Sequence, residues 1–175
     1  MLLSQLLGPE IAAPDAAARL FITGLTADSR LAAPGFVFVA MPGARTDGAR
    51  FVADAAARGA SVIVTRSETE VPDGIGAIVL RVANPRRELA LMASRFYPAQ
   101  PAVTVAVTGT SGKTSVAEFT RQIFAHAGKR AASLGTIGIV KPDGAVYGSL
   151  TTPDPVSLHR TLDELARQGI SHLAF

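Results

Sequence analysis

The chain has 175 residues, of which 48% are hydrophobic and 18% are charged. This composition supplies ample apolar material for one large domain or two small ones and argues against disorder. The net charge of +3 is small and spread along the chain, which excludes a nucleic-acid-binding surface built from clustered Lys and Arg and suits an anionic small substrate. Cysteine is absent, so disulfides and cysteine-based metal sites are excluded, in keeping with a reducing compartment.

The N-terminal segment shows neither an export signal nor a membrane anchor. The stretch MLLSQLLGPE has no basic region before its apolar run, and Glu10 ends that run early. No apolar stretch in the chain reaches the ~20 residues that a membrane-spanning helix needs. The sequence therefore predicts a cytoplasmic protein with no membrane partner.

Short apolar strands alternate with helical patterns along the first half of the chain, which predicts an α/β fold with a largely parallel sheet. The elements are expected at residues 35–41 (strand), 48–58 (helix, ended by Gly59), 61–65 (strand), 77–82 (strand) and from residue 85 onward (helix). Asn84 and Pro85 have the character of an N-cap and a first helical residue. Behind them, apolar residues at helical spacing mark a buried face. These are Leu89, Met92, Ala93 and Phe96.

The segment Tyr97–Pro101 interrupts this alternation. Two prolines stand within four residues there, and proline cannot continue a helix and stiffens a linker. We therefore expect a boundary between two domains, residues 1–98 and residues 99–175.

The second half of the chain repeats the α/β pattern. The β-branched run at residues 103–107 suits a central parallel strand. We expect a helix at residues 113–127, a strand at 131–140, a turn at 142–144, a helix from residue 155 that ends at Gly169, and a strand at 170–175. Along one face of the first helix lie Val116, Phe119, Ile123 and Ala127. The buried residues of the second helix are Leu158, Leu162 and Leu165. Gly128 ends the first helix, and Asp154 caps the second, with Pro155 as its first residue.

The most informative motif lies between the strand at 103–107 and the helix that follows. It reads TGTSGKTS from Thr108 to Ser115. Glycines let a loop turn its backbone amides inward toward phosphate oxygens, and a helix N-terminus adds partial positive charge at the same place. Lys113 is then expected to neutralise phosphate charge, and the Thr114 hydroxyl to ligate Mg²⁺. The motif thus predicts an ATP site with Mg²⁺ as cofactor.

This motif departs from the general P-loop pattern in one respect. That pattern has a glycine where this chain has Val107, so the loop here is the shorter G-x-x-G-K-T. The alternative is an ordinary glycine-rich turn with a solvated lysine. The order of strand, glycines, lysine, hydroxyl and helix favours the phosphate loop.

The shorter loop resembles the ATP loop of the Mur ligase family and its relative folylpolyglutamate synthetase. Three further stretches are similar to the MurE type within that family. They are TADSR followed by PGFVFVA (residues 26–30 and 34–40), PGARTDG (residues 42–48), and SLGTIG followed by LTTPD (residues 133–138 and 150–154). Leu150 stands where the family commonly has Asn. The stretches occur in the family's order along nearly the whole chain.

The resemblance implies the fold of each domain and its ligand. It implies a small N-terminal Rossmann-like α/β UDP-binding domain, followed by the first part of a P-loop central α/β ATP-binding domain. It implies that ATP is bound by seven residues, Gly109, Thr110, Ser111, Gly112, Lys113, Thr114 and Ser115. Among them, Lys113 is implied as the catalytic residue and Thr114 as the metal ligand. It implies UDP-MurNAc-peptide binding by Ala27, Ser29, Ala44, Arg45, Thr46, Thr151 and Thr152.

Each of these loop residues also has a plainer interpretation. Asp28 and Ser29 are common in turns, Thr151 and Thr152 can cap the helix that follows, and Arg45 can be a solvated loop residue. The three histidines of the chain lack the spacing of a metal site, and we assign them no role.

The resembled family forms amide bonds with ATP. The resemblance implies that an amino acid, with meso-diaminopimelate favoured over L-lysine, is added to UDP-MurNAc-L-Ala-D-Glu through an acyl phosphate. It also implies that further metal ligands and the amino-acid-binding domain lie beyond residue 175, so that this stretch alone is inactive. The alternatives are a MurF-type ligase, an unrelated P-loop switch or kinase, and a non-enzymatic UDP-sugar-binding module.

Overall fold

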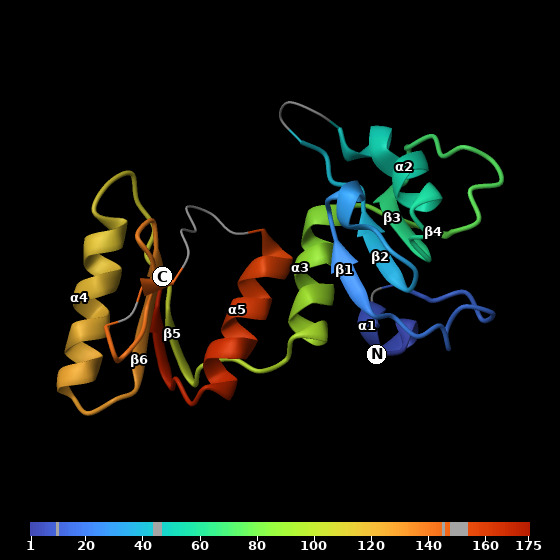
Figure 1. Ribbon diagram of the computed structural model, residues 1–175. Helices are drawn as coiled ribbons and strands as arrows, with labels where there is room; N and C mark the ends of the chain where they lie inside the picture. The colour runs from blue at the N-terminus through green and yellow to red at the C-terminus, as the bar shows by residue number, and fades with distance from the viewer. Residues whose placement is uncertain (10, 44–46, 145, 148–153) are drawn as a thin grey trace. The chain divides into compact units, whose positions relative to one another are not determined.

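A computed structural model of the chain describes residues 1–9, 11–43, 47–144, 146–147 and 154–175. These residues form two compact units, Met1–Phe96 and Tyr97–Phe175, each with a sheet and helices of its own (Figure 1). Within the described ranges, no helix is long and apolar enough to cross a membrane.

The first unit is built on a four-stranded parallel sheet in the order β1-β2-β3-β4. Its helices and strands are α1 (Leu3–Leu7), β1 (Gly24–Thr26), η1 (Ser29–Leu31), β2 (Phe36–Val39), η2 (Gly48–Phe51), α2 (Val52–Ala57), β3 (Val62–Arg66), β4 (Ile78–Val82) and α3 (Pro85–Phe96). The parallel sheet confirms the expected α/β class. The expected helix at residues 48–58 begins as a 3-10 turn, which Asp47 caps by accepting a hydrogen bond from the Ala49 amide at 3.0 Å.

Alternate residues of the strands in this unit point to opposite faces of the sheet, and both faces are apolar. Phe38 and Ile63 pack on one face with Val52 and Ala55, at the start and middle of α2. Helix α3 lies near β1, β2 and β3, and its residues Leu89, Met92 and Ala93 are fully buried, as the helical spacing predicted. The expected N-cap is also present, because the Asn84 side chain accepts a hydrogen bond from the Arg87 amide at 3.1 Å.

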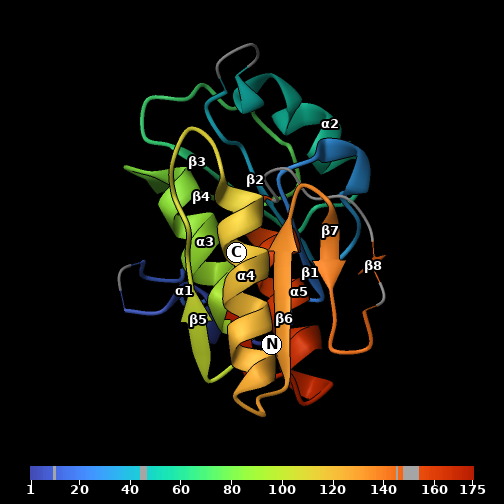
Figure 2. The same ribbon diagram turned by 90° about the vertical axis from the view of Figure 1, so that its left-hand side faces the viewer.

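The second unit has a five-stranded mixed sheet in the order β5-β9-β6-β7-β8. Its elements are β5 (Val103–Val105), α4 (Lys113–His126), β6 (Ala131–Gly135), β7 (Gly138–Val140), β8 (Val146–Tyr147), α5 (Pro155–Arg167) and β9 (His172–Ala174). Strands β5, β9 and β6 are parallel, whereas β7 and β8 run antiparallel to their neighbours. Helices α4 and α5 lie on opposite faces of this sheet, α4 in front and α5 behind in Figure 2.

One expectation for this unit was wrong. The single strand at residues 131–140 is instead a hairpin of β6 and β7, because the chain reverses between Gly135 and Gly138, and Gly138 has a φ of 108° that other residues rarely adopt. Among the described residues, the strand expected at 103–107 is β5, which pairs with β9. Strand order depends on pairing between distant segments, which the β-branched composition of one strand does not report.

The ends of the helices in this unit follow the expected signals. Asp154 accepts hydrogen bonds from the amides of Val156 and Ser157 at the start of α5, and Pro155 is the first helical residue. Gly128 follows α4 with a φ of 73°. The outer face of α4 carries the expected apolar row, but it is exposed: Val116, Phe119 and Ile123 are 49%, 61% and 68% accessible.

Candidate functional site

The loop between β5 and α4 has the backbone conformation of a phosphate-binding turn. Gly109 and Gly112 have φ values of 148° and 76°, in the region that favours glycine, and Gly112 stands directly before the first residue of α4. The first intrahelical bond of α4 runs from the Val116 amide to the Gly112 carbonyl at 3.0 Å. The three amides before it have no acceptor within the helix, so they and the helix dipole present positive charge at this end.

Lys113 lies at the centre of this loop. It is exposed, and its Nζ donates a hydrogen bond to the Gly109 carbonyl at 2.6 Å. The ammonium group is therefore folded back over the turn that leads into the helix start. An anion drawn to the amides of that helix start meets the ammonium group at the same place.

The other residues expected to bind ATP surround Lys113. Gly109, Thr110, Ser111, Gly112 and Ser115 are all exposed, whereas Thr114 is partly buried. The Thr114 hydroxyl lies 2.8 Å from the hydroxyl of Thr136, the first residue after β6. The structure thus brings the seven predicted residues together at the carboxyl end of β5, where open α/β sheets bind ligands.

Glu118 anchors the helix that carries this loop, and the sequence reasoning missed it. Its carboxylate accepts hydrogen bonds from Arg121 Nη2 at 2.5 Å, from Gln122 Nε2 at 3.0 Å and from Ser133 Oγ at 2.7 Å. The pKa of Glu118 is lowered to about 2, mainly by the hydrogen bond from the Arg121 guanidinium and to a smaller extent by the bonds from Ser133 and Gln122. Because Ser133 belongs to β6, this carboxylate ties α4 to the sheet. The Glu–Arg spacing of three residues on a helix was the available signal.

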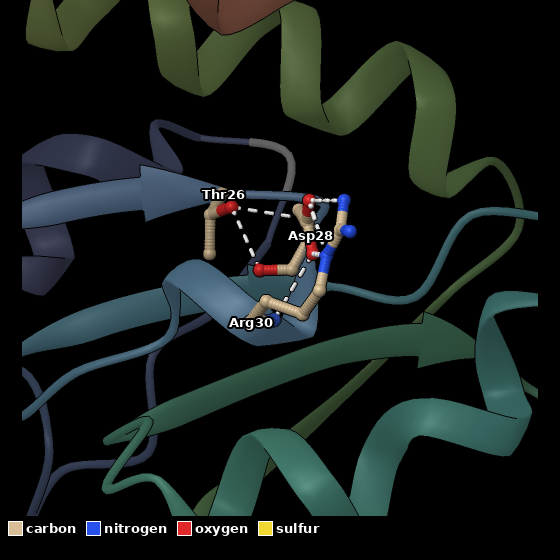
Figure 3. A network of polar contacts seen from close by, with 3 residues as sticks. All are labelled: Thr26, Asp28 and Arg30. Carbon is tan, nitrogen blue, oxygen red and sulfur yellow. Dashed lines mark hydrogen bonds and ion pairs between the residues drawn. The ribbon is translucent and has the colours of Figure 1, made fainter.

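In the first unit, the candidate loop follows β1. Figure 3 shows how Asp28 organises it: the carboxylate accepts hydrogen bonds from the backbone amide of Arg30 at 3.0 Å and from Arg30 Nη2 at 2.6 Å. The Thr26 hydroxyl accepts a bond from the Asp28 amide at 2.9 Å and donates to the Asp28 carbonyl at 3.1 Å. The Arg30 side chain holds the pKa of Asp28 below its usual value. The result is a hydrogen-bonded turn at the carboxyl end of β1.

Ala27 and Ser29, the two described residues expected to bind the sugar nucleotide, lie in this turn. Ala27 is half-buried, and Ser29 is only 6% exposed. Interaction with the Ser29 side chain, and after it the hydrogen bond from Arg58, lowers the pKa of the Asp54 carboxyl in α2. The Ser29 hydroxyl has lone pairs that can accept a hydrogen bond from a ligand.

The remaining predicted residues lie outside the described part of the chain. They are Ala44, Arg45, Thr46, Thr151 and Thr152, together with the Leu150 substitution. Asp47, which follows the first of these stretches, pairs with Arg66 Nη2 at 3.0 Å. Across the described residues, no group of three or more His, Cys, Asp or Glu side chains could hold a metal ion.

A parallel strand, a glycine turn and a helix that begins with Gly-Lys-Thr define a P-loop protein, here joined to a separate parallel α/β unit. Sequence comparison then assigns both units. Residues 21–97 match the catalytic domain of the Mur ligase family, and residues 107–175 match the Mur ligase middle domain. The chain belongs to the Mur ligase family.

Its relatives and structural neighbours point the same way. A UDP-N-acetylmuramoyl-L-alanyl-D-glutamate–2,6-diaminopimelate ligase of Bradyrhizobium diazoefficiens is 56% identical over 175 residues, which are 100% of this chain and 36% of that protein. The ligase of the same name from Rhizobium meliloti is 56% identical over 158 residues, 90% of this chain and 32% of its own length. The chain thus spans about a third of the length of the curated relatives that it matches.

Two solved structures show the same fold. A diaminopimelate ligase of the same name superposes with a TM-score of 0.80 and 23% identity, over 100% of this chain and 36% of its own. MurF from Acinetobacter baumannii superposes with a TM-score of 0.55 and 27% identity, over 88% of this chain and 30% of its own.

Proposed function

We propose that this chain forms the UDP-binding and ATP-binding part of a ligase that joins meso-diaminopimelate to UDP-MurNAc-L-Ala-D-Glu. The observation that carries the proposal is the loop in which Lys113 Nζ lies 2.6 Å from the Gly109 carbonyl, directly at the start of α4. The relatives that share 56% identity over most or all of the chain bear the name of this ligase, which supports the same conclusion.

The proposed reaction has two steps. The carboxylate of the D-Glu residue attacks the γ-phosphoryl group of ATP, giving an acyl phosphate and ADP. An amine of the amino acid then attacks the acyl carbon, the C–O bond to phosphate breaks, and an amide and inorganic phosphate result. In this scheme the residues of the loop position and neutralise the phosphates, which is the main task of a protein in phosphoryl transfer.

Each loop residue has a distinct part in the proposal. The amides of Lys113, Thr114 and Ser115 face the phosphate oxygens at the helix start, and the Lys113 ammonium neutralises charge on the β- and γ-phosphates. Gly109 and Gly112 keep the turn open, because a side chain at their positive φ values is strained. The exposed Thr110 and Ser111 complete the loop with their backbone amides.

Mg²⁺ fits this site through the Thr114 hydroxyl. Mg²⁺ prefers oxygen ligands, keeps several waters and is commonly held between one or two protein oxygens and the substrate phosphates. A partly buried hydroxyl at the helix start supplies one such oxygen. The ion, when bound, neutralises charge on the transferring phosphoryl group.

The UDP end of the sugar nucleotide is proposed for the first unit. Ala27 and Ser29 lie in the turn after β1, and Asp47, which follows residues 44–46, lies between β2 and α2. The proposed residues of this unit are Ala27, Ser29, Ala44, Arg45 and Thr46, and Thr151 and Thr152 of the second unit are proposed for the muramoyl-peptide part. The hydrogen-bonded Asp28–Arg30 turn supports the role of the first unit, since a preformed loop loses little entropy on binding.

A MurF-type ligase is the second candidate. The Acinetobacter baumannii MurF structure shares 27% identity and the same fold, but with a TM-score of 0.55. The relatives named as diaminopimelate ligases share about twice that identity. An unrelated P-loop switch and a non-enzymatic module are set aside, because both units match Mur ligase domains.

Calorimetric titration of the full-length protein with the non-hydrolysable ATP analogue AMP-PNP and Mg²⁺ tests the ATP site. Lys113→Ala removes a charge-assisted contact and is expected to weaken binding about 10- to 100-fold. Lys129→Ala is the matched control, since Lys129 is exposed just beyond the other end of α4. The Lys129→Ala protein should bind the analogue as the unmodified protein does. Equal affinity in Lys113→Ala and the control contradicts the proposed site.

A further inference from the structure

The hydroxyl expected to meet Mg²⁺ has a partner that comes from a different element. Thr114 Oγ1, in the first turn of α4, lies 2.8 Å from Thr136 Oγ1, in the turn between β6 and β7. This hydroxyl pair links two segments that are 22 residues apart in the sequence. Thr136 carries no role in the function proposed above.

We propose that Thr136 is a positioning residue for the metal site: it accepts the hydroxyl proton of Thr114, so that a lone pair of Thr114 Oγ1 faces the cation held by the nucleotide phosphates. The inference rests on the proposed ATP site. Thr136 itself touches neither nucleotide nor metal in this proposal and acts through Thr114.

The physical reason lies in the geometry of a hydroxyl group. Threonine Oγ1 carries one hydrogen and two lone pairs, and the hydrogen rotates to suit its surroundings. Without a nucleotide, either Thr114 or Thr136 can be the donor in their shared bond. A cation at Thr114 Oγ1 polarises its O–H bond and repels the hydrogen, so Thr114 becomes the donor and Thr136 the acceptor. Partners of this kind orient metal ligands in general.

The packing of α4 on β6 holds the two hydroxyls at this distance. One turn beyond Thr114, the Glu118 carboxylate accepts a bond from Ser133 Oγ at 2.7 Å. Beside Thr136, Gly135 presents only its backbone to Thr114, and a Cβ placed on Gly135 would lie 3.5 Å from Thr114 Oγ1 and Cγ2, at ordinary contact distance. The side chain of Thr114 thus lies next to the end of β6 and within hydrogen-bond distance of Thr136.

The plainer alternative is that the pair only stabilises the hairpin. The two interpretations differ in what they predict for Mg²⁺. A purely structural bond changes the unfolding free energy when it is lost, but it leaves the gain in nucleotide affinity that Mg²⁺ provides unchanged. A positioning bond changes that gain.

The experiment measures the magnesium coupling, defined as the ratio of the AMP-PNP dissociation constants without and with Mg²⁺. Calorimetry on the full-length protein compares Thr136→Val, Thr136→Ala and Thr136→Ser. Val and Ala remove the acceptor, and we expect about a 10-fold loss of coupling, as for other partners of metal ligands. Ser retains the hydroxyl and should restore the coupling to within about twofold.

Thr120→Val is the matched control. The Thr120 hydroxyl donates to the Val116 carbonyl at 2.8 Å on the same helix, so the same chemical change is made without touching Thr114. Its coupling should equal that of the unmodified protein. Thermal unfolding of every variant verifies that the proteins are folded at the titration temperature, and the Ala variant serves if the Val variant is not.

The outcomes separate the inference from the proposed function. If the unmodified protein gains affinity from Mg²⁺ and Thr136→Val and Thr136→Ala gain as much, the inference is wrong and the ATP site stands. The same holds if Thr136→Ser loses as much coupling as Thr136→Val. If the unmodified protein binds no AMP-PNP in either condition, the proposed function fails and the inference with it.

Discussion

The side chains of the turn after β1 bond to one another. Asp28 accepts bonds from the amide and the guanidinium of Arg30, and the Ser29 side chain lowers the pKa of Asp54. The sequence indicated the turn, because Asp and Ser favour such positions. It could not indicate that Ser29 interacts with Asp54, since that interaction depends on how α2 packs beside η1.

The interaction between Ser29 and Asp54 allows a direct test of whether Ser29 binds the sugar nucleotide. Ser29→Ala removes both this interaction and any contact with the ligand, whereas Asp54→Asn weakens only the former. We expect Ser29→Ala to lower the affinity for UDP-MurNAc-L-Ala-D-Glu about 3- to 10-fold, as for one lost hydrogen bond, and Asp54→Asn to leave it unchanged. Calorimetric titration measures both. An equal loss in the two variants means that Ser29 serves only to hold the turn.

At the scale of elements, local signals predicted the ends of helices better than the pairing of strands. Asp154 and Pro155 open α5 as expected, because a cap depends on residues a few positions apart. The hairpin of β6 and β7 was missed, although glycines at 135 and 138 flank its turn. The position of β5 at the end of the described sheet follows from its pairing with β9, which is almost 70 residues away.

Glu118 connects α4 to β6, and its protonation should weaken the second unit. Its pKa is lowered from 4.5 to about 2 in the folded chain, so folding is favoured by the charged form. This contribution is present above about pH 4.5 and is lost as the pH falls toward 2. We expect Glu118→Gln to lower the free energy of unfolding at pH 7 by about 2 kcal/mol and to flatten its decline below pH 4.5.

Urea unfolding of the full-length protein at several pH values measures the effect of Glu118→Gln. Glu164→Gln provides the comparison, because Glu164 is exposed on α5. The unfolding free energy of the Glu164→Gln protein should follow that of the unmodified protein at every pH. A Glu118→Gln protein as stable as the Glu164→Gln protein at pH 7 contradicts the anchoring role.

Asp163 makes a second connection between elements of this unit. Its carboxylate accepts a bond from the Ala99 amide at 2.9 Å, in the segment before β5, and from Arg167 at 2.5 Å. Asp163 is 7% exposed, so Asp163→Ala leaves an amide without its acceptor and should destabilise the unit by about 1–3 kcal/mol. Arg167→Gln removes only an ion pair whose arginine is largely exposed, and it should cost less than about 1 kcal/mol.

Urea denaturation of the two variants distinguishes the contributions of Asp163. A larger loss of stability in Arg167→Gln than in Asp163→Ala would mean that the ion pair, rather than the bond to Ala99, holds this segment against α5.

At the scale of the whole chain, every described candidate residue follows the end of a parallel strand. Ala27 and Ser29 follow β1, the phosphate loop follows β5, and Thr136 follows β6. All of them therefore lie at carboxyl ends of parallel strands, where open α/β sheets bind ligands. The order of strand and loop could be predicted from the sequence, and so could the loops that carry the proposed site residues. The partners Glu118, Ser133 and Thr136 could not, because they depend on packing between elements.

We propose that this chain belongs to a ligase that uses ATP to add diaminopimelate. The most direct measurement is ADP release by the full-length protein supplied with Mg²⁺, ATP, UDP-MurNAc-L-Ala-D-Glu and either meso-diaminopimelate, L-lysine or D-alanyl-D-alanine. We predict release that requires the sugar nucleotide and is fastest with meso-diaminopimelate. No release with meso-diaminopimelate, or release driven equally well by D-alanyl-D-alanine, contradicts the claim.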